Sequence, residues 1–229
     1  SAKCYEFMIW LLTCEHYSNG LPLKYAEVFL DAVDVLESHR GYDLRVAPMF
    51  IRLEPLFDES FHYRYSRLLI EPNRSLSHKH LFSPFTTGFS ASEKADLISN
   101  YYQPYRKRIE EFIGSYIDQG VFHISVHSFT PKHGNQNRET PVGLKFDSSK
   151  SQERNLAVIW KKMIMDIDPS INVRFNYPYR GAADGFTAYL RKCFPKNYVG
   201  FELEIRNDVI LDVRTSIYES LANLRGILE

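Results

Sequence analysis

Four short polar segments that end apolar runs restrict the fold of this 229-residue chain more than any other feature. Nearly unbroken apolar runs such as Phe7–Thr13 are typical of strands that are buried on both faces. Loops at the carboxyl ends of strands in an open α/β sheet project side chains into one shared cleft. We therefore expect a single cleft to receive the four polar segments, which are Cys14–His16, Asn73–Arg74, His127–Pro131 and Glu202–Arg206.

The rest of the sequence alternates between strand and helix patterns. Strands are predicted at residues 7–13, 62–70, 121–126, 142–146, 172–175 and 198–205. Apolar residues at helical spacing predict helices at residues 24–38, 43–57, 90–120, 152–165, 185–194 and 212–228. The third helix opens with a capping box at Ser90–Glu93, and Pro104 is expected to kink it. This alternation indicates an α/β fold with a mostly parallel sheet and helices on both faces, in one domain over residues 1–229.

Charge and composition exclude several classes of protein. Lys+Arg and Asp+Glu both number 28, so the formal net charge is zero and supports neither a nucleic-acid nor a membrane-surface partner. No apolar run approaches the roughly 18 residues that span a bilayer, and no signal peptide is visible in the first residues. Three cysteines without C-x-x-C spacing fit a reducing cytoplasm. One of them, Cys14, is interpreted as a buried thiol rather than a nucleophile.

His16 and His127 are the best candidates for metal ligands, because each follows or ends an apolar run. One histidine in such a place is usually a hydrogen-bonded structural residue, but two with carboxylates nearby make a metal site an equal alternative. Catalytic zinc sites usually keep three protein ligands and one water. Glu15 is the nearest candidate for the third ligand, and Asn19 and Asp43 remain alternatives.

Glu202, Glu204 and Arg206 alternate with apolar residues, so they share one face of a strand. A solvated face of an edge strand would explain this pattern. Carboxylates in a buried strand would instead be costly without a partner or a metal. In that case one glutamate could serve as a general base, while an arginine holds the other.

Arg67, Asn73 and Arg74 are candidates for binding an anionic substrate. The arginine side chain binds a carboxylate through two parallel hydrogen bonds. Surface salt bridges are equally compatible with the local sequence. Arg138, in a polar loop, and Asn176, in a turn-rich segment, are further candidate substrate-binding residues.

Seven segments, in this order, resemble the N-formylglutamate amidohydrolase family. The resemblance runs from about Leu11 to Asp208, which is most of the chain. The segments are TCEHYSN (13–19), HRGYD (39–43), YSRLLIEPNR (65–74), YQPY (102–105), VHSFTP (126–131), NYPYRG (176–181) and ELEIR (202–206).

The resemblance implies a fold and an activity. The family is similar to zinc carboxypeptidases and aspartoacylases, which implies a three-layer α/β/α sandwich around a mixed, mostly parallel sheet. It also implies a single zinc ion and cleavage of an amide next to a carboxylate. Asn73–Arg74 resembles the pair that binds a substrate carboxylate, and Glu204–Arg206 resembles the segment that carries the general base. Arg45 and Arg191 depart from residues common in the family, which bears on the substrate more than on the chemistry.

These observations lead us to expect a zinc-dependent amidohydrolase of a small, anionic N-acyl amino acid, nominally N-formyl-L-glutamate. His16, His127 and Glu15 would hold one zinc ion, and Glu204 would be the general base. Arg67, Asn73 and Arg74 would hold substrate carboxylates or the oxyanion. One alternative is a metallopeptidase or deacylase that acts on a peptide or cell-wall amide. Another is a non-catalytic binding module, which would have no use for a general base. The sequence does not predict the oligomeric state.

Overall fold

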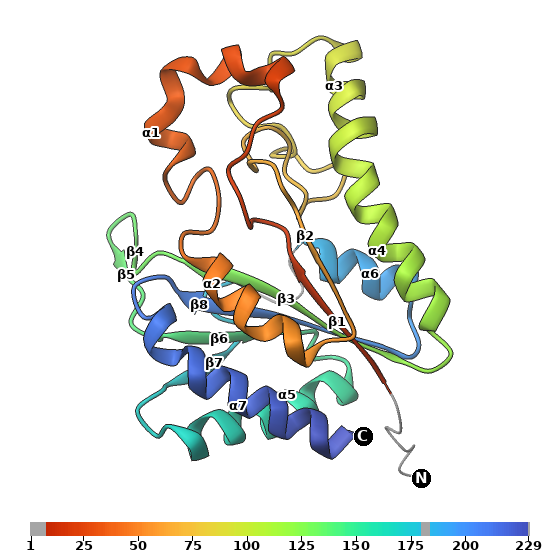
Figure 1. Ribbon diagram of the computed structural model, residues 1–229, viewed down its shortest axis with the longest axis vertical. Helices are drawn as coiled ribbons and strands as arrows, with labels where there is room; N and C mark the ends of the chain where they lie inside the picture. Colours follow the sequence, from red (N-terminus) through yellow and green to blue (C-terminus); the bar gives the residue numbers. More distant parts are fainter. Residues whose placement is uncertain (1–7, 180–183, 229) are drawn as a thin grey trace.

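Six strands form one mixed sheet in the order β2-β1-β3-β8-β6-β7 (Figure 1). The computed structural model describes residues 8–179 and 184–228. β6 runs antiparallel to β8, and the other neighbouring pairs are parallel. The strands are β1 (Ile9–Cys14), β2 (Glu59–His62), β3 (Val121–Phe129), β6 (Val142–Lys145), β7 (Val173–Phe175) and β8 (Tyr198–Arg206), and a separate hairpin joins β4 (Lys132–His133) and β5 (Gln136–Asn137).

Helices cover both faces of this sheet, which confirms the predicted α/β fold class (Figure 1). No helix in the described ranges is long and apolar enough to cross a membrane. The α-helices are α1 (Val33–Leu36), α2 (Val46–Leu53), α3 (Ala91–Leu97), α4 (Gln103–Tyr116), α5 (Ser151–Ile167), α6 (Phe186–Cys193) and α7 (Ile210–Leu228). The 3₁₀-helices are η1 (Leu23–Ala32) and η2 (Glu54–Leu56), and η3 (Ile98–Tyr102) is a π-helix.

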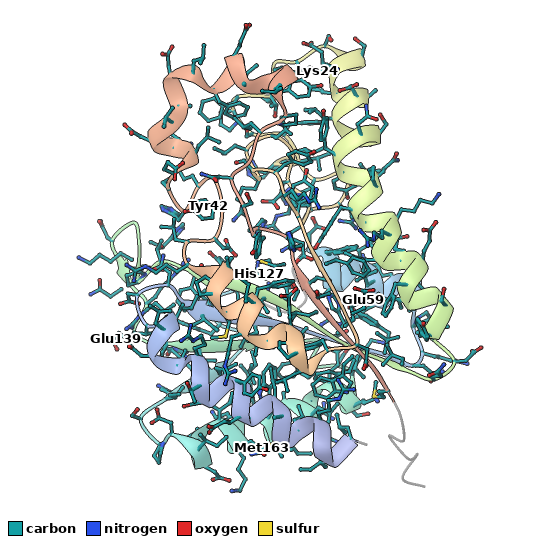
Figure 2. All side chains as sticks on the ribbon, in the orientation of Figure 1. Lys24, Tyr42, Glu59, His127, Glu139 and Met163 are labelled. Carbon is teal, nitrogen blue, oxygen red and sulfur yellow. The ribbon has the colours of Figure 1, made fainter. Side chains whose placement is uncertain are left out.

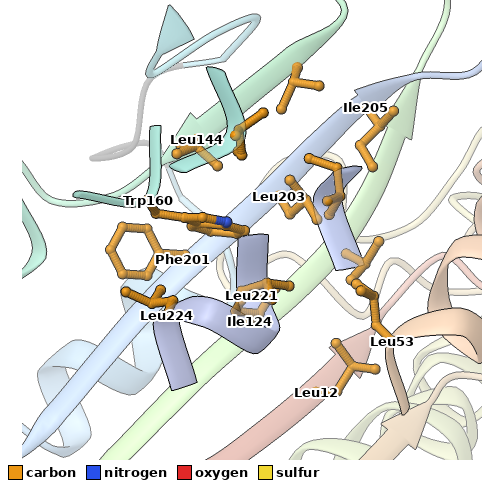
Figure 3. Close-up of a cluster of buried hydrophobic side chains, with 14 of the residues drawn as sticks. Leu12, Leu53, Ile124, Leu144, Trp160, Phe201, Leu203, Ile205, Leu221 and Leu224 are labelled. Atoms are coloured by element: carbon orange, nitrogen blue, oxygen red, sulfur yellow. The ribbon is translucent and has the colours of Figure 1, made fainter. Parts of the chain in front are cut away.

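The main hydrophobic core lies between the sheet and helices α2, α5 and α7. Figure 3 shows Trp160, Leu221 and Leu224 of the helices against strand residues such as Phe201 and Leu203. The indole N–H of Trp160 donates to Ser220 Oγ at 3.0 Å, so its polar atom is satisfied inside this core. The apolar face of the sheet is therefore anchored by large, fully buried side chains.

The opposite face of the sheet packs against α4 and α6 through a smaller apolar cluster. Side chains alternate between the two faces along each strand, so this second face receives every other residue of β3 and β8. Toward the carboxyl ends of these strands it carries Ser125, His127, Glu202 and Glu204, all of them buried. A row of buried polar groups at this position requires partners, and it marks the location of a site.

A second layer stands above the carboxyl ends of the central strands (Figure 1). It contains η1, α1, the loops between residues 63 and 90, and α3, and it has its own apolar cluster. The Ser90 hydroxyl and the Glu93 side chain form the predicted capping box at the start of α3. The carboxyl ends of the strands therefore face a layer of protein rather than open solvent.

Two predicted elements in this second layer were wrong. The strand expected at residues 62–70 overlaps β2 only at His62. Residues 63–70 lie outside the sheet, with an isolated bridge from Tyr65 to Gly20 and a turn at residues 67–69, and the apolar side chains of Leu68 to Ile70 are buried in the second cluster. The helix expected at residues 24–38 is largely the 3₁₀-helix η1. The kink expected at Pro104 takes the form of the π-helical turn η3 immediately before it, because proline has no N–H to continue the regular ladder.

Candidate metal centre

A polar cavity of about 170 Å³ lies where the carboxyl ends of β1, β3 and β8 meet the second layer. Figure 2 shows His127 at this boundary. Charged side chains from both layers converge on it, although they are far apart in the sequence. The charged side chains that line it are His16, Asp43, Arg67, Arg74, His127, Lys145, Asp184, Glu202 and Glu204.

His16, Asp43 and His127 form the only group of three potential ligands found among the described residues. One ligand atom of each lies within 4.8 Å of the others, and all three side chains are buried. Asp43 Oδ2 is 3.0 Å from His127 Nδ1, and Asp43 Oδ1 is 3.5 Å from His16 Nδ1. The backbone N–H of Ser128 also donates to Asp43, which fixes the carboxylate between the two rings.

Each imidazole contacts a second carboxylate through its Nε2 atom. His16 Nε2 lies 2.6 Å from Glu71 Oε1, and His127 Nε2 lies 3.2 Å from Glu15 Oε2. Histidines that bind metals usually have this arrangement, in which a carboxylate on the far nitrogen fixes the ring and the tautomer. Nδ1 of both rings is therefore the nitrogen that faces the possible ion.

Glu15, expected as the third ligand, is not in this group. Its carboxylate contacts the far nitrogen of His127 and accepts hydrogen bonds from Tyr105 Oη at 2.9 Å and from Ser125 Oγ. Asp43, one of the alternatives from the sequence, lies between the two Nδ1 atoms. Asn19, the other alternative, donates to Leu36 O and Glu37 Oε1.

The donor set fits a zinc-class ion. Two imidazole nitrogens and one carboxylate oxygen form a common catalytic set for zinc, with the fourth position open. The surroundings contain five buried carboxylates, at Glu15, Asp43, Glu71, Glu202 and Glu204, against the cations Arg67, Arg74 and Lys145. Burial alone would raise the pKa of Glu15, but His127 and Ser125 hold it at about 2. The group is thus rich in negative charge, which favours a bound cation.

Glu204 and Glu202 have different surroundings on β8. Glu202 accepts hydrogen bonds from Lys145 Nζ at 2.5 Å and from Thr187 Oγ1 at 2.6 Å, so both of its oxygens have partners. Burial opposes ionisation of Glu202, but Lys145 and His127 hold its pKa at about 2. No described residue donates a hydrogen bond to Glu204, whose Oε1 lies 3.8 Å from Lys145 Nζ. Burial raises the pKa of Glu204, although Lys145 and His127 oppose this.

β8 is an interior strand, between β3 and β6, and both glutamates are 3% exposed. The solvated edge face considered from the sequence is therefore wrong. Glu204 lies directly opposite His127 in the β3–β8 register, so it faces the same cavity. Arg206 points elsewhere and donates to Asp208 and to backbone carbonyls of residues 138 and 139.

The segment after β2 supplies three further cavity residues, Arg67, Asn73 and Arg74. Arg67 donates to Glu71 Oε2, and its Nη1 also lies 3.5 Å from Asp43 Oδ1. Asn73 Oδ1 accepts the backbone N–H of Phe186 at 2.6 Å, which leaves its amide N–H groups available to a ligand. Arg74 Nη1 donates to the backbone carbonyl of Asp184.

Arg138 and Asn176 do not line the cavity. Arg138 Nη2 lies 3.4 Å from the hydroxyl of Tyr179, which does line it. The side-chain oxygen of Asn176 accepts the N–H of Phe146 at 3.0 Å, so its amide stabilises the end of β6. Two residues of the motif that contains Asn176, Arg180 and Gly181, lie outside the described residues.

Cys14 is fully buried and belongs to the core on the other face of the sheet. Burial, with Asp43 and Glu15 as further causes, raises the pKa of its thiol well above the usual value. A thiol in this position is not activated as a nucleophile.

Three residues of the site were not named as candidates from the sequence: Lys145 and Asp184, which line the cavity, and Glu71, which supports His16. A signal for Lys145 was present, because a lysine occupies a short strand whose residues are all buried. Glu71 follows the apolar residues Leu68 to Ile70, as the other polar segments follow theirs. Neither sequence pattern specifies which residue the side chain contacts, so neither pattern could identify a site.

Comparisons with known proteins identify the family of this chain. A family model described as N-formylglutamate amidohydrolase matches residues 8–211. Gene product Atu2144 from Agrobacterium tumefaciens is similar in structure, with a TM-score of 0.78 and 29% identity over 96% of this chain and 89% of that chain. A metallo-carboxypeptidase from Burkholderia cenocepacia matches with a TM-score of 0.44 and 9% identity over 97% of this chain and 58% of that chain. A search of curated proteins finds no match.

The family match extends over far more than half of the sequence, and it includes every residue of the cavity. The chain belongs to the N-formylglutamate amidohydrolase family.

Proposed function

We propose that this protein is a zinc-dependent amidohydrolase that cleaves the amide of a small, anionic N-acyl amino acid. N-formyl-L-glutamate, which would give formate and glutamate, is the nominal substrate. The observation that carries the proposal is the position of Glu204, a buried carboxylate without a hydrogen-bond donor among the described residues, in one cavity with His16, Asp43 and His127. Family membership supports amide hydrolysis as the reaction class.

His16, Asp43 and His127 would hold the ion, with Asp43 in the place first considered for Glu15. The Nδ1 atoms face Asp43, and the Nε2 atoms are held by Glu71 and Glu15. A zinc ion bound by such a set acidifies a water molecule and polarises a carbonyl oxygen.

Glu204 would be the general base. It would accept a proton from the attacking water and deliver it to the leaving nitrogen, since a carboxylate on a rigid strand that accepts no hydrogen bond from a described residue can do both. Glu202 is already bound to Lys145 and Thr187, so it is the weaker candidate for proton transfer. Burial keeps the pKa of Glu204 above its ordinary value, which brings its basicity closer to neutral pH.

Arg67, Asn73 and Arg74 would orient the substrate. Arg67 lies next to Asp43, close enough to the proposed ion to donate to the negative charge that develops on the acyl oxygen. Asn73 and Arg74 lie further along the same segment and would hold a substrate carboxylate. The small size of the cavity favours a small N-acyl amino acid over the peptide or cell-wall amides of the alternative interpretation.

A substrate panel tests the proposal. The zinc-loaded protein is assayed with N-formyl and N-acetyl derivatives of glutamate, aspartate, glutamine and leucine, together with a short acylated peptide. We expect release of the acyl group from acidic substrates at a rate that depends on zinc and on Glu204. Hydrolysis of the peptide alone would favour the peptidase alternative, and zinc binding without hydrolysis of any substrate would favour a binding module.

A further inference from the structure

A second concavity, of about 410 Å³, lies apart from the candidate metal centre. Consecutive residues 60–65, which include the end of β2, line one side, and residues of η3 and the first half of α4 line the other. Figure 1 shows β2 and α4 next to each other. We call this concavity the β2 groove. None of its lining residues lines the metal cavity, so a ligand here would be distinct from the substrate.

The β2 groove follows the edge of the sheet. β2 is the outermost strand in the order of the described strands, next to β1 alone. Six consecutive residues, 60–65, border the groove, so it runs along the length of this segment. An outermost strand presents backbone N–H and C=O groups that can pair with an added strand.

Four tyrosines, Tyr63, Tyr65, Tyr101 and Tyr105, line the groove. Tyr63 packs edge to face against Tyr65 and Tyr105, with ring centroids 5.7 and 5.3 Å apart, and Tyr65 packs against Tyr101 at 5.1 Å. The hydroxyl of Tyr63 is buried, and no described residue is its hydrogen-bond partner. Tyrosine and arginine are the residues enriched at the energetic centres of protein interfaces.

The charge of the groove is positive. Arg64 and Arg108 line it, and both are exposed. No aspartate or glutamate lines it, and neither arginine is paired with a carboxylate of a described residue, although the Arg108 guanidinium lies over the ring of Phe61, 4.7 Å from its centroid. The chain as a whole has no net charge, so this local excess is not a general property of the surface. An occupant with carboxylates would complement it.

We propose that the β2 groove binds an extended peptide segment with acidic side chains, which adds to the sheet as a strand alongside β2. Its backbone would pair with the edge strand, its carboxylates would contact Arg64 and Arg108, and its apolar side chains would pack on the tyrosines. Tyr105 connects this groove with the metal centre, because its ring lines the groove while its hydroxyl donates to Glu15 beside His127.

The test uses a fluorescein-labelled peptide of alternating glutamate and valine, titrated with the full chain and followed by anisotropy. We expect saturable binding that becomes weaker by roughly tenfold or more in the double variant Arg64→Glu, Arg108→Glu. Arg174→Glu, an exposed arginine on β7 at the opposite edge of the sheet, is the matched control and should bind as wild type does. Circular dichroism verifies that all three proteins are folded.

Two further peptides complete the test. A lysine–valine peptide should not bind, and a glutamate–valine peptide with N-methyl groups on alternate amides should bind at least roughly tenfold more weakly, because it cannot complete a strand ladder. The proposal is overturned if the acidic peptide does not bind, if the double variant binds it as wild type does, or if either altered peptide binds equally well. These outcomes do not depend on hydrolysis.

Discussion

Asp43 and Glu15 contact opposite nitrogens of the His127 imidazole, so we expect their removal to affect zinc binding differently. Asp43→Ala should lose most of the bound zinc, because it deletes a ligand. Glu15→Gln should keep zinc but bind it about 10–100-fold more weakly, the usual effect of losing a carboxylate behind a metal-bound histidine. Elemental analysis and competition with a zinc indicator measure both variants. A protein that keeps zinc without Asp43 and loses it without Glu15 would restore the ligand set first expected from the sequence.

Lys145 should determine the acid limb of the pH profile. Glu204 must be ionised to accept a proton, so activity should fall as the pH falls through its pKa, which burial raises and Lys145 lowers. Lys145→Met removes the lowering charge and should move the acid limb of kcat/KM to higher pH at saturating zinc.

The matched control for this prediction is Lys162→Met, which removes an exposed lysine that pairs with Asp166 and should leave the profile unchanged. If the acid limb of the kcat/KM profile moves to lower pH in Lys145→Met, or does not move, this role of Lys145 is contradicted.

Sequence patterns predicted several of the residues that meet in the cavity, since His16, Arg67, Asn73, Arg74, His127 and Glu204 all line it. His16, Asn73, Arg74 and His127 follow or end an apolar run, whereas Arg67 precedes one and Glu204 alternates with apolar residues. Glu71 also follows an apolar run and Lys145 lies in a buried strand, but these patterns do not assign either residue to the site. Their partners His16 and Glu202 are 55 and 57 residues away, and spacing within a segment does not specify contacts over such distances.

At the scale of elements, the strands with long apolar runs were predicted well, because burial on both faces gives them a clear pattern. Residues 63–70 have a similar pattern but form an irregular segment, with one isolated bridge at Tyr65 and a turn at residues 67–69. Ser66 donates its hydroxyl to Gly41 O and its backbone N–H to Gly20 O, and these contacts replace a strand ladder. The second layer is thus stabilised by contacts between distant loops, which periodicity in the sequence does not report.

The apolar face of β8 is expected to contribute strongly to stability. Leu203 is fully buried in the main core between Glu202 and Glu204. Leu203→Ala should reduce the free energy of unfolding by about 2–5 kcal/mol, through lost transfer energy and a cavity. Urea denaturation measures this change, and Leu211→Ala on α7, where the leucine is 56% exposed, is the control. Equal, small changes in both variants would mean that this core is loosely packed.

At the scale of the whole molecule, the candidate centre joins two layers. The sheet supplies His127 and Glu204, the second layer supplies Arg67, and the loop that leads from α1 of this layer to α2 supplies Asp43. His16 follows β1 at the boundary, where its backbone carbonyl accepts the N–H of Asp43. A ligand set divided in this way is complete only when the layers are packed together, so metal binding should stabilise the packed state.

Chelation tests this coupling. Zinc at 100 times its dissociation constant adds about 2.7 kcal/mol to the free energy of unfolding if only the folded chain binds it. A chelator should therefore lower the thermal midpoint of wild type. It should leave the midpoint of His16→Ala unchanged, because that variant has lost the site. Equal sensitivity of both proteins to the chelator would mean that zinc binds elsewhere.

We propose Glu204 as the general base of a metal-dependent amidohydrolase, and a comparison of Glu204→Gln with Glu202→Gln tests this role. Both variants keep the size and the hydrogen-bonding capacity of the side chain, and turnover of N-formyl-L-glutamate is measured at matched zinc occupancy. We expect Glu204→Gln to remain folded and to keep its zinc, while its kcat falls about 10²–10⁴-fold below that of wild type. Glu202→Gln should lose stability more than rate, because its carboxylate is bound to Lys145 and Thr187. A near-normal rate in Glu204→Gln, with the loss in Glu202→Gln or in neither variant, would contradict the account.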